Sequence, residues 1–382
     1  MSLAPPALSY GVFSPAGGSA RAGARHDGRV LDLAALARAG LLDGFPGAAA
    51  AFAAPALDAF MAAGPAAWEA TRLQLEALLG DARVERHSHA LADVAPLLPF
   101  TIADFADFYA SLEHAINLGR IFRPGGEALL PNWRHLPVGY HGRAGTVVVS
   151  GTDIVRPRGQ FLPAGEAAPE FGPSGRLDLE LELGFVIGTP SRLGEPVAVS
   201  EALRHVFGVV LLNDWSARDL QAWEYQPLGP FLGKSFATSI GAWVTPLAAL
   251  EALRVPAPAQ EPEPLPYLRE APWALDLDLE VELNGVVVSR TSARHLYWSP
   301  AQMIAHLTAN GASLRTGDLL GSGTISGPAR GQRGSLIELS WNGAEPLALP
   351  GGETRSFLED GDSVVLRGSR LGEVAGRILP TA

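Results

Sequence analysis

Residues 204–238 read RHVFGVVLLNDWSARDLQAWEYQPLGPFLGKSFAT, and the rest of the chain is organised around this stretch. The β-branched and apolar run 206–212 predicts a buried strand, which ends at Asn213 and Asp214, residues suited to capping a helix. Polar residues then recur at the spacing of one helix face, at about 3.6 residues per turn: Asp214, Arg218, Gln221 and Tyr225. A polar stripe that begins where a strand ends is either a solvated helix surface or the wall of a site.

Lys234 follows this stripe and is the only lysine of the chain, since all the other basic residues are arginine. The two residue types are interchangeable on a solvated surface, but not where a compact ammonium group must fit. Chance is the alternative explanation, but Gly and Pro bound the segment, and such loops commonly carry sites. The run GPFLGKS is not a phosphate-binding loop, because three residues separate its glycines where that motif has four.

The composition indicates a globular protein with two domains, since 382 residues exceed the usual size of a single core. A formal charge of −11 argues against nucleic acid and anionic membranes as partners, because both bind basic surfaces. The absence of Cys excludes disulfides, thiolate metal sites and a Cys nucleophile. The start MSLAPPALSYG has no secretory pattern, and prolines interrupt the apolar stretch 45–68. We therefore expect a cytoplasmic protein with no membrane span.

The first 98 residues are expected to form a unit of their own, and residues 99–382 the second. Residues 10–14 and 30–31, separated by a Gly-rich segment with Asp27-Gly28, predict a small hairpin. Ala-rich helical patterns follow at 32–41, 55–63 and 65–79. Pro96 and Pro99 interrupt the periodicity and indicate the boundary.

Residues 101–143 combine a helical pattern with a long irregular segment. The spacing of Asp107, Ser111 and His114 predicts that they share one helix face, with Asp107 at its start. A helix-start carboxylate and a core histidine are the alternative reading. The segment beyond Arg123 is dense in Trp, Tyr, His, Pro and Gly, which is typical of a loop that lines a site.

Residues 176–188, RLDLELELGFVIG, alternate strictly, so a strand would project Asp178, Glu180 and Glu182 from one face. Carboxylates in such a row repel each other unless water or a cation separates them. Residues 273–283, WALDLDLEVEL, alternate in the same way before Asn284-Gly285, a strong hairpin signal, and there the acidic face is most simply solvent-facing. Alternation alone therefore does not decide whether the acidic face of residues 176–188 binds a cation or faces solvent.

The candidate residues include four carboxylates, one His and the only Lys. The carboxylates are Asp107, Glu180, Glu182 and Asp214. Ligation by several carboxylates suits a hard cation such as Ca²⁺ or Mg²⁺, with Mn²⁺ as a third possibility. Spacing does not establish whether the carboxylates converge.

Long runs of the chain resemble the fumarylacetoacetase (fumarylacetoacetate hydrolase) family. They are DFYASLEHAINLGRIFR, LPNWRHLPVGYHGR, LDLELELGF, NDWSARDLQAWEYQPLGPFLGKSF and GDLLGSGTISG. The resemblance covers nearly the whole chain. It implies a mainly β, α+β fold with a small SH3-like N-terminal barrel and a mixed β-roll catalytic domain, in a homodimer. It also implies metal-dependent hydrolysis of fumarylacetoacetate to fumarate and acetoacetate, the last step of tyrosine and phenylalanine catabolism.

The resemblance also assigns roles residue by residue. The implied metal ligands are Asp107, Glu180, Glu182 and Asp214, with a second cation at Asp214, Lys234 and Thr238. The implied catalytic residues are His114 as base, Glu338 as its partner, and the charge-stabilising Arg218, Gln221 and Lys234. The implied substrate contacts are Tyr109, Arg123, Tyr140, Gln221, Tyr225 and Thr324. Ala237 stands where the family usually has Gly, and its methyl group tightens that loop.

These assignments fit the chemistry of a diketo acid, in which water attacks a carbonyl and a carbanion leaves. A base takes the proton of water, a cation stabilises the enolate, and buried donors hold the developing oxyanion. The alternatives are a related acylpyruvate or diketo-acid hydrolase and a non-catalytic, Ca²⁺-stabilised β-scaffold.

Overall fold

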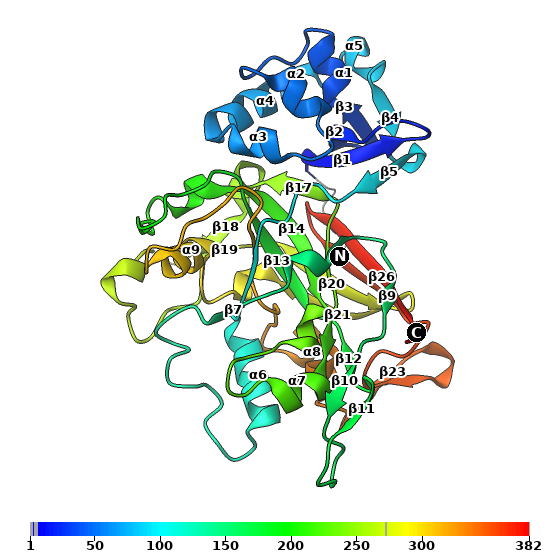
Figure 1. The fold of residues 1–382 in the computed structure, drawn as a ribbon, viewed down its shortest axis with the longest axis vertical. Coiled ribbons are helices and arrows are strands. Elements are labelled where there is room, and N and C mark those ends of the chain that lie inside the picture. Colours follow the sequence, from blue (N-terminus) through cyan, green and yellow to red (C-terminus); the bar gives the residue numbers. More distant parts are fainter. Residues whose placement is uncertain (1–2, 4–6, 272, 382) are drawn as a thin grey trace.

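The computed structural model describes residue 3 and residues 7–271 and 273–381. Figure 1 shows a smaller N-terminal lobe in blue above a larger lobe built around long strands. The expected sheet-rich α+β fold is confirmed, since strands outnumber helices in the described chain and the helices lie between groups of strands. No helix in the described ranges combines the length and apolarity that crossing a membrane requires.

The N-terminal lobe is an open antiparallel ladder covered by short helices. Its strands pair in the order β4-β3-β2-β1, and β5 pairs with β1; within the described residues these pairings do not close into a ring. The strands are β1 (Ser9–Pro15), β2 (Arg21–His26), β3 (Arg29–Asp32), β4 (Ser88–Ala90) and β5 (Val94–Leu97). The helices are α1 (Leu33–Arg38), α2 (Ala48–Ala53), α3 (Asp58–Ala62), α4 (Pro65–Leu78) and α5 (Ala82–Glu85).

Most of the patterns predicted in this lobe recur in the structure. The predicted helices at 32–41, 55–63 and 65–79 correspond to α1, α3 and α4. The hairpin turn at Asp27-Gly28 joins β2 to β3, and both residues have positive φ, 42° and 74°. The prediction omitted β2, whose run RAGARH carries small and charged residues and lacks a β-branched signal.

The central sheet runs through both lobes. Strand β1 pairs with β17 through Tyr10 and Val244, and the order continues β17-β14-β13-β22-β6-β7. The strands are β6 (Phe105–Phe108), β7 (Gly139–His141), β13 (Leu181–Ile187), β14 (Val206–Asp214), β17 (Trp243–Pro246) and β22 (Leu319–Gly321). Strands β16 (Thr238–Ile240) and β8 (Val147–Val149) attach beside β14.

Strand β14 is buried along its whole length, as the apolar run 206–212 predicts. Val209 and Leu211 pack into the core of the larger lobe, whereas Val210 and Leu212 pack into the core shared with the N-terminal lobe. Successive side chains of a strand point to opposite faces, so β14 joins the two cores. Its last residue, Asp214, therefore emerges at a rigid position.

A second sheet, in the order β21-β20-β25-β26-β9, lies against the first. It comprises β9 (Ile154–Val155), β20 (Asp278–Leu283), β21 (Val286–Ser292), β25 (Ser363–Gly368) and β26 (Gly372–Leu379). Asn284 and Gly285 have φ of 51° and 80°, so the predicted hairpin turn is confirmed. Glu280 and Glu282 pair with surface arginines, which confirms the solvent-facing reading of this acidic strand.

Short elements complete the larger lobe. The strands are β10 (Arg158–Phe161), β11 (Glu170–Pro173), β12 (Leu177–Asp178), β15 (Ser216–Ala217), β18 (Arg254–Pro256), β19 (Trp273–Leu275), β23 (Leu347–Ala348) and β24 (Thr354–Arg355). The helices are α6 (Leu112–Phe122), α7 (Arg218–Glu224), α8 (Leu232–Ser235), α9 (Pro300–Thr308) and α10 (Leu336–Leu339).

The structure corrects three local predictions around the site. Asp214 does not begin a helix, because β14 extends to it through pairing with Thr238 of β16, and α7 starts at Arg218. Asp107 belongs to β6, where it pairs with Gly321 and Tyr140, so it is not a helix-start residue. Lys234 lies in the short helix α8 and not in a loop. For Asp214 and Asp107, sheet pairing overrides a local helical spacing.

Candidate active site and metal centre

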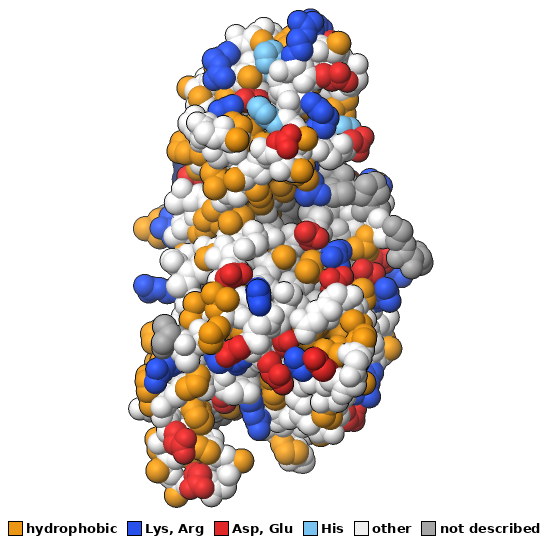
Figure 2. Space-filling view, turned by 90° about the vertical axis from the view of Figure 1, so that its right-hand side faces the viewer, with side chains coloured by type: hydrophobic (Ala, Val, Ile, Leu, Met, Phe, Trp, Pro, Cys, Tyr) orange, Lys and Arg blue, Asp and Glu red, His pale blue; other side chains and the backbone are white. Residues whose placement is uncertain are grey.

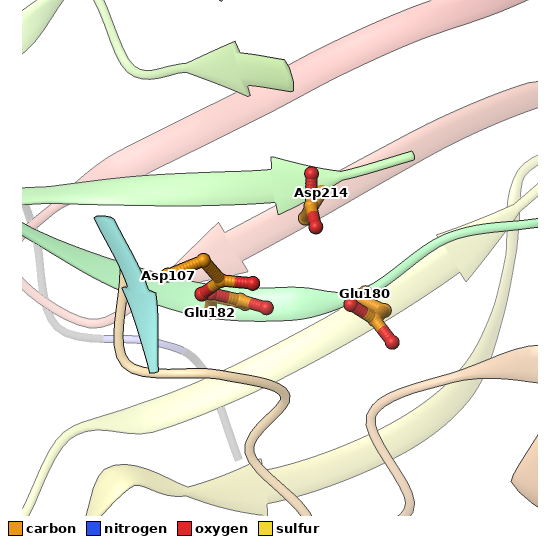
Figure 3. A group of neighbouring side chains, drawn as sticks. All are labelled: Asp107, Glu180, Glu182 and Asp214. Atoms are coloured by element: carbon orange, nitrogen blue, oxygen red, sulfur yellow. The ribbon is translucent and has the colours of Figure 1, made fainter. Parts of the chain in front are cut away.

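Four carboxylates from three segments of the chain meet inside the larger lobe (Figure 3): Asp107, Glu180, Glu182 and Asp214. One oxygen of each lies within 4.8 Å of the others, and all four side chains are buried. Asp107 comes from β6, Glu182 from β13 and Asp214 from the end of β14. Glu180 comes from the break between β12 and β13, where the predicted continuous strand is interrupted. The structure thus brings together the ligand set that spacing alone left undecided.

Sheet register explains this convergence. Leu181 pairs with Asn213 in the β13–β14 ladder, so Glu180 and Asp214 lie side by side, joined by a main-chain hydrogen bond. Asp107 reaches the cluster from the other side, opposite Gly321 of β22. A Cβ atom at Gly321 would lie 2.5 Å from Asp107 Oδ1 and 3.0 Å from an oxygen of Glu182. Only glycine therefore leaves room for these carboxylates.

Several groups hold the carboxylates in place. Lys234 Nζ donates to Glu180 and, at 2.8 Å, to Asp214 Oδ2, while Arg218 Nη2 donates to Glu180 Oε1 at 2.6 Å. The hydroxyl groups of Tyr140 and Thr238 donate to the two oxygens of Asp214, each at 2.9 Å. Lys234 and Thr238, which the resemblance links to a second cation, thus both contact Asp214.

Two oxygens of the cluster lack a hydrogen-bond partner among the described residues: Asp107 Oδ1 and Glu182 Oε1, both buried. Burial, reinforced by the neighbouring carboxylates, raises the pKa of Asp107 and of Glu182 well above the usual range. Burial also opposes ionisation of Glu180, but the charges of Lys234 and Arg218 hold the pKa of its carboxyl below the usual value.

These observations fit a divalent cation. Among the described residues, the four carboxylates pair with two Lys or Arg side chains, Lys234 and Arg218, so negative charge is left uncompensated. The oxygens of Asp107 and Glu182 that lack a hydrogen-bond partner among the described residues are the atoms that would ligate such an ion. All four ligating groups offer oxygen, which suits a hard metal ion. The cluster therefore has the donors and the charge to bind a divalent metal.

His114 lies beside this cluster on helix α6. Its Nδ1 is 2.7 Å from Glu338 Oε2, and its Nε2 is 3.9 Å from Glu180 Oε1. The Tyr109 ring packs edge-on against the imidazole, with ring centroids 5.3 Å apart. Burial alone would raise the pKa of Glu338, but the facing imidazole and its other hydrogen bonds hold it below the usual range. Glu338 thus stays ionised and fixes the orientation of His114.

The remaining predicted site residues divide into two groups. Gln221 accepts from Arg218 Nη1 at 3.1 Å, and the Thr324 hydroxyl is buried without a partner among the described residues. Arg123 instead donates to the main chain of its own loop, and the Tyr225 hydroxyl accepts from Gln226. No hydrogen bond within residues 7–271 and 273–381 links these last two residues to the cluster.

The sequence reasoning missed four polar residues that support the site. The Asn117 amide and the Ser326 and Ser335 hydroxyls all donate to Glu338. Asp178 was grouped with Glu180 and Glu182, but it binds Arg218 and not the cluster. The available signals were spacing: Asn117 follows His114 by three residues, and Ser335 precedes Glu338 by three.

A buried carboxylate cluster that borders a His–Glu pair on a sheet-rich scaffold defines the arrangement of a metal-dependent hydrolase. The chain belongs to the fumarylacetoacetase family. The model described as fumarylacetoacetase N-terminal matches residues 7–102, and the model described as fumarylacetoacetate (FAA) hydrolase C-terminal matches residues 104–379. The resemblance seen in the sequence is thereby confirmed.

Curated relatives match over nearly their whole lengths. Fumarylacetoacetase of Arabidopsis thaliana is 46% identical over 400 residues, which cover 98% of this chain and 95% of the relative. The Homo sapiens enzyme of the same name is 44% identical over 403 residues, with the same coverage of both chains. Among solved structures, fumarylacetoacetate hydrolase from Exiguobacterium antarcticum covers 98% of this chain and 100% of its own, with a TM-score of 0.56 and 18% identity. That last similarity concerns the fold.

Proposed function

We propose that this chain hydrolyses the carbon–carbon bond of fumarylacetoacetate, giving fumarate and acetoacetate as the last step of tyrosine and phenylalanine catabolism. The observation that carries the proposal is the position of His114. Its Nδ1 is fixed by Glu338 and its Nε2 borders the four-carboxylate cluster. Relatives that share 44–46% of their residues with nearly the whole chain carry the name fumarylacetoacetase, which supports the substrate.

His114 is the proposed general base. The ionised Glu338 accepts a hydrogen bond, so Nδ1 of the imidazole carries the proton and Nε2 keeps its lone pair. Nε2 then takes the proton of the water whose oxygen attacks the substrate carbonyl, a role that typically contributes about 10²–10⁴-fold.

The cationic side chains are proposed to hold the charge that develops on the substrate oxygens. Arg218 and Lys234 both bind Glu180 and are already buried, so they need no solvent reorganisation, and the half-buried Gln221 accepts from Arg218. As the bond breaks, its electron pair stays with the departing enolate, and Lys234 Nζ is the proposed proton donor. A divalent cation held by Asp107, Glu180, Glu182 and Asp214 would supply Lewis acidity toward the diketone oxygens.

Substrate contacts are proposed for residues around this centre. Thr324 offers a buried hydroxyl with no partner among the residues that the structure describes, and Tyr109 and Tyr140 flank His114 and Asp214. Arg123 and Tyr225 would bind the substrate carboxylates, a role for which a guanidinium fork is suited. Both would turn from their present partners to do so.

Further properties of the proposal rest on the family. Ca²⁺, Mg²⁺ and Mn²⁺ are the proposed ions, because all accept oxygen donors. Residues 1–98 and 99–382 are proposed as SH3-like and catalytic domains of a cytoplasmic homodimer. In support of self-association, hydrophobic side chains gather on the surface below the upper lobe in Figure 2, where charged side chains of both signs are sparse.

The test compares wild-type protein with His114→Ala on fumarylacetoacetate and on a shorter acylpyruvate, each with Mg²⁺, Ca²⁺ or Mn²⁺. We expect wild type to favour fumarylacetoacetate, and the variant to lose hydrolysis while retaining its fold and metal binding. Wild-type protein that hydrolyses neither substrate with any of these ions would favour a structural role for the cluster. Preference for the acylpyruvate would make the chain a related diketo-acid hydrolase.

A further inference from the structure

Asp178 is a fully buried carboxylate that takes no part in the metal cluster. Its Oδ2 accepts from Arg218 Nε at 2.8 Å and from the Ile337 amide at 3.1 Å. Its Oδ1 accepts from the Leu336 amide at 2.7 Å and from the Leu179 amide at 2.8 Å. Four donors thus satisfy the carboxylate from separate directions, and a group held in this way has one available orientation.

Asp178 contacts the charge-stabilising group through Arg218. Arg218 Nε binds Asp178, Nη2 binds Glu180 at 2.6 Å and Nη1 binds Gln221 at 3.1 Å. A guanidinium is planar and presents its donors in a fixed fork. The carboxylate of Asp178 therefore sets the plane in which Arg218 meets Glu180 and Gln221.

Asp178 is also linked, through helix α10, to the proposed proton-transfer pair of His114 and Glu338. Asp178 accepts from the first two amides of α10, and Glu338 is the third residue of that helix. Ser335, at the N-cap position of α10, makes no capping bond to its backbone, since its hydroxyl donates to Glu338. Asp178 is thus the side chain that anchors the start of α10, and through it the position of Glu338 against His114.

We propose that Asp178 is a positioning residue that aligns the His114–Glu338 pair with the Arg218 group. Both arms meet on the same carboxylate, since Oδ2 accepts from both Arg218 and Ile337, so a displacement of this carboxylate moves the base and the charge-stabilising group together. The inference rests on the proposed function, because it concerns the alignment of groups that act on one substrate. Displacements of about 1 Å in such groups can cost about 100-fold in rate.

The test is Asp178→Asn, which keeps the shape but turns one acceptor oxygen into a donor group that faces either Arg218 and Ile337 or Leu336 and Leu179. We expect kcat for fumarylacetoacetate to fall by about 100-fold, with KM within about threefold of wild type, because the substrate contacts do not touch Asp178. Asp178→Glu, which keeps the charge with Arg218 but moves the oxygens by one methylene, is expected to lose at least about tenfold in kcat.

Asp32→Asn is the matched control in the N-terminal lobe. Asp32 is likewise buried and accepts from an Arg Nε, at 2.7 Å from Arg21, and from a helix-start amide, at 2.9 Å from Ala35. We expect this variant to lose stability while its kcat per folded molecule stays at the wild-type value. A kcat for folded Asp178→Asn, or for Asp178→Glu if the former does not fold, within about threefold of wild type would overturn the inference.

A double-variant cycle tests the path through Glu338. Because Asp178 acts partly by positioning Glu338, Asp178→Asn should cost much less in a Glu338→Gln background than in wild type, about tenfold and not 100-fold. An undiminished cost in that background would refute the α10 arm. Failure of wild type to hydrolyse the substrate would refute the proposed function instead, so the two failures are distinguishable.

Discussion

Glu338→Gln changes a buried carboxylate on which four donors converge. Glu338 Oε2 accepts from His114 Nδ1 at 2.7 Å, from Ser335 at 2.7 Å and from Ser326 at 2.9 Å, and Oε1 accepts from Asn117 at 2.9 Å. A glutamine offers one oxygen and one NH₂ group, so its amide must face at least one of these donors. The variant therefore leaves a buried donor unsatisfied and frees the imidazole of His114.

Two magnitudes follow from this geometry. An unsatisfied buried donor costs about 1–3 kcal/mol, so the free energy of unfolding should fall by that amount at neutral pH. Loss of a correctly oriented base should lower kcat by about 10²–10⁴-fold, with a smaller change in KM. The assay follows the loss of ultraviolet absorbance of the diketone under saturating divalent metal, with urea unfolding in parallel.

The pH dependence of stability gives an independent check. The pKa of Glu338 is lower in the folded protein than its ordinary value of about 4.3. The stabilisation that ionised Glu338 provides is therefore fully present above pH of about 4.3, and it is lost as the pH falls through the lower pKa of Glu338 in the folded protein. Acidification below that folded pKa should narrow the difference in the free energy of unfolding between wild type and Glu338→Gln.

Glu282→Gln is the control for this experiment, because Glu282 pairs with Arg367 near the surface at 2.5 Å. It should change stability by less than about 1 kcal/mol and leave kcat unchanged. A folded Glu338→Gln protein with wild-type kcat, or with a stability gap that widens in acid, would refute the assigned role of Glu338.

Three further predictions concern the buried polar groups. Asp107→Asn should raise the melting temperature in chelator, since it removes a carboxylate that its acidic neighbours repel and whose Oδ1 has no partner among the described residues. It should also abolish the stabilisation by Mn²⁺; a lower melting temperature in chelator would contradict the assignment of a metal site. Lys234→Arg should lose most activity at constant charge, because a guanidinium does not fit between Glu180 and Asp214; near-wild-type kcat would remove the argument from the single lysine. Tyr10→Phe should raise the free energy of unfolding by about 1 kcal/mol, because the buried Tyr10 hydroxyl has no hydrogen-bond partner within the described residues. A lower free energy of unfolding in urea would contradict this expectation.

Strand β14 was predictable from the sequence because its signal is local, and the carboxylate set was predictable because the chain resembles a known family. The apolar run 206–212 indicates a strand buried on both faces, and the family resemblance selects the four carboxylates. The hairpin at Asn284-Gly285 is equally local, since its turn requires residues that tolerate positive φ.

The secondary structure around Asp107 and Asp214 was not predictable, because non-local pairing decides it. Both residues fit a helical spacing with their neighbours, but β22 and β16 recruit them into the sheet. Asp178 was misread for a related reason. It shares an alternating pattern with Glu180 and Glu182, and only the packing of α10 and Arg218 separates its role from theirs.

The dependence of hydrolysis on the carboxylate cluster is tested by titrating metal-stripped protein with Mn²⁺. Hydrolysis of fumarylacetoacetate and the amount of bound metal are measured together. We predict negligible hydrolysis without metal, and activity that rises in proportion to Mn²⁺ bound at the Asp107, Glu180, Glu182 and Asp214 cluster. Full hydrolysis by the metal-free protein would contradict this prediction.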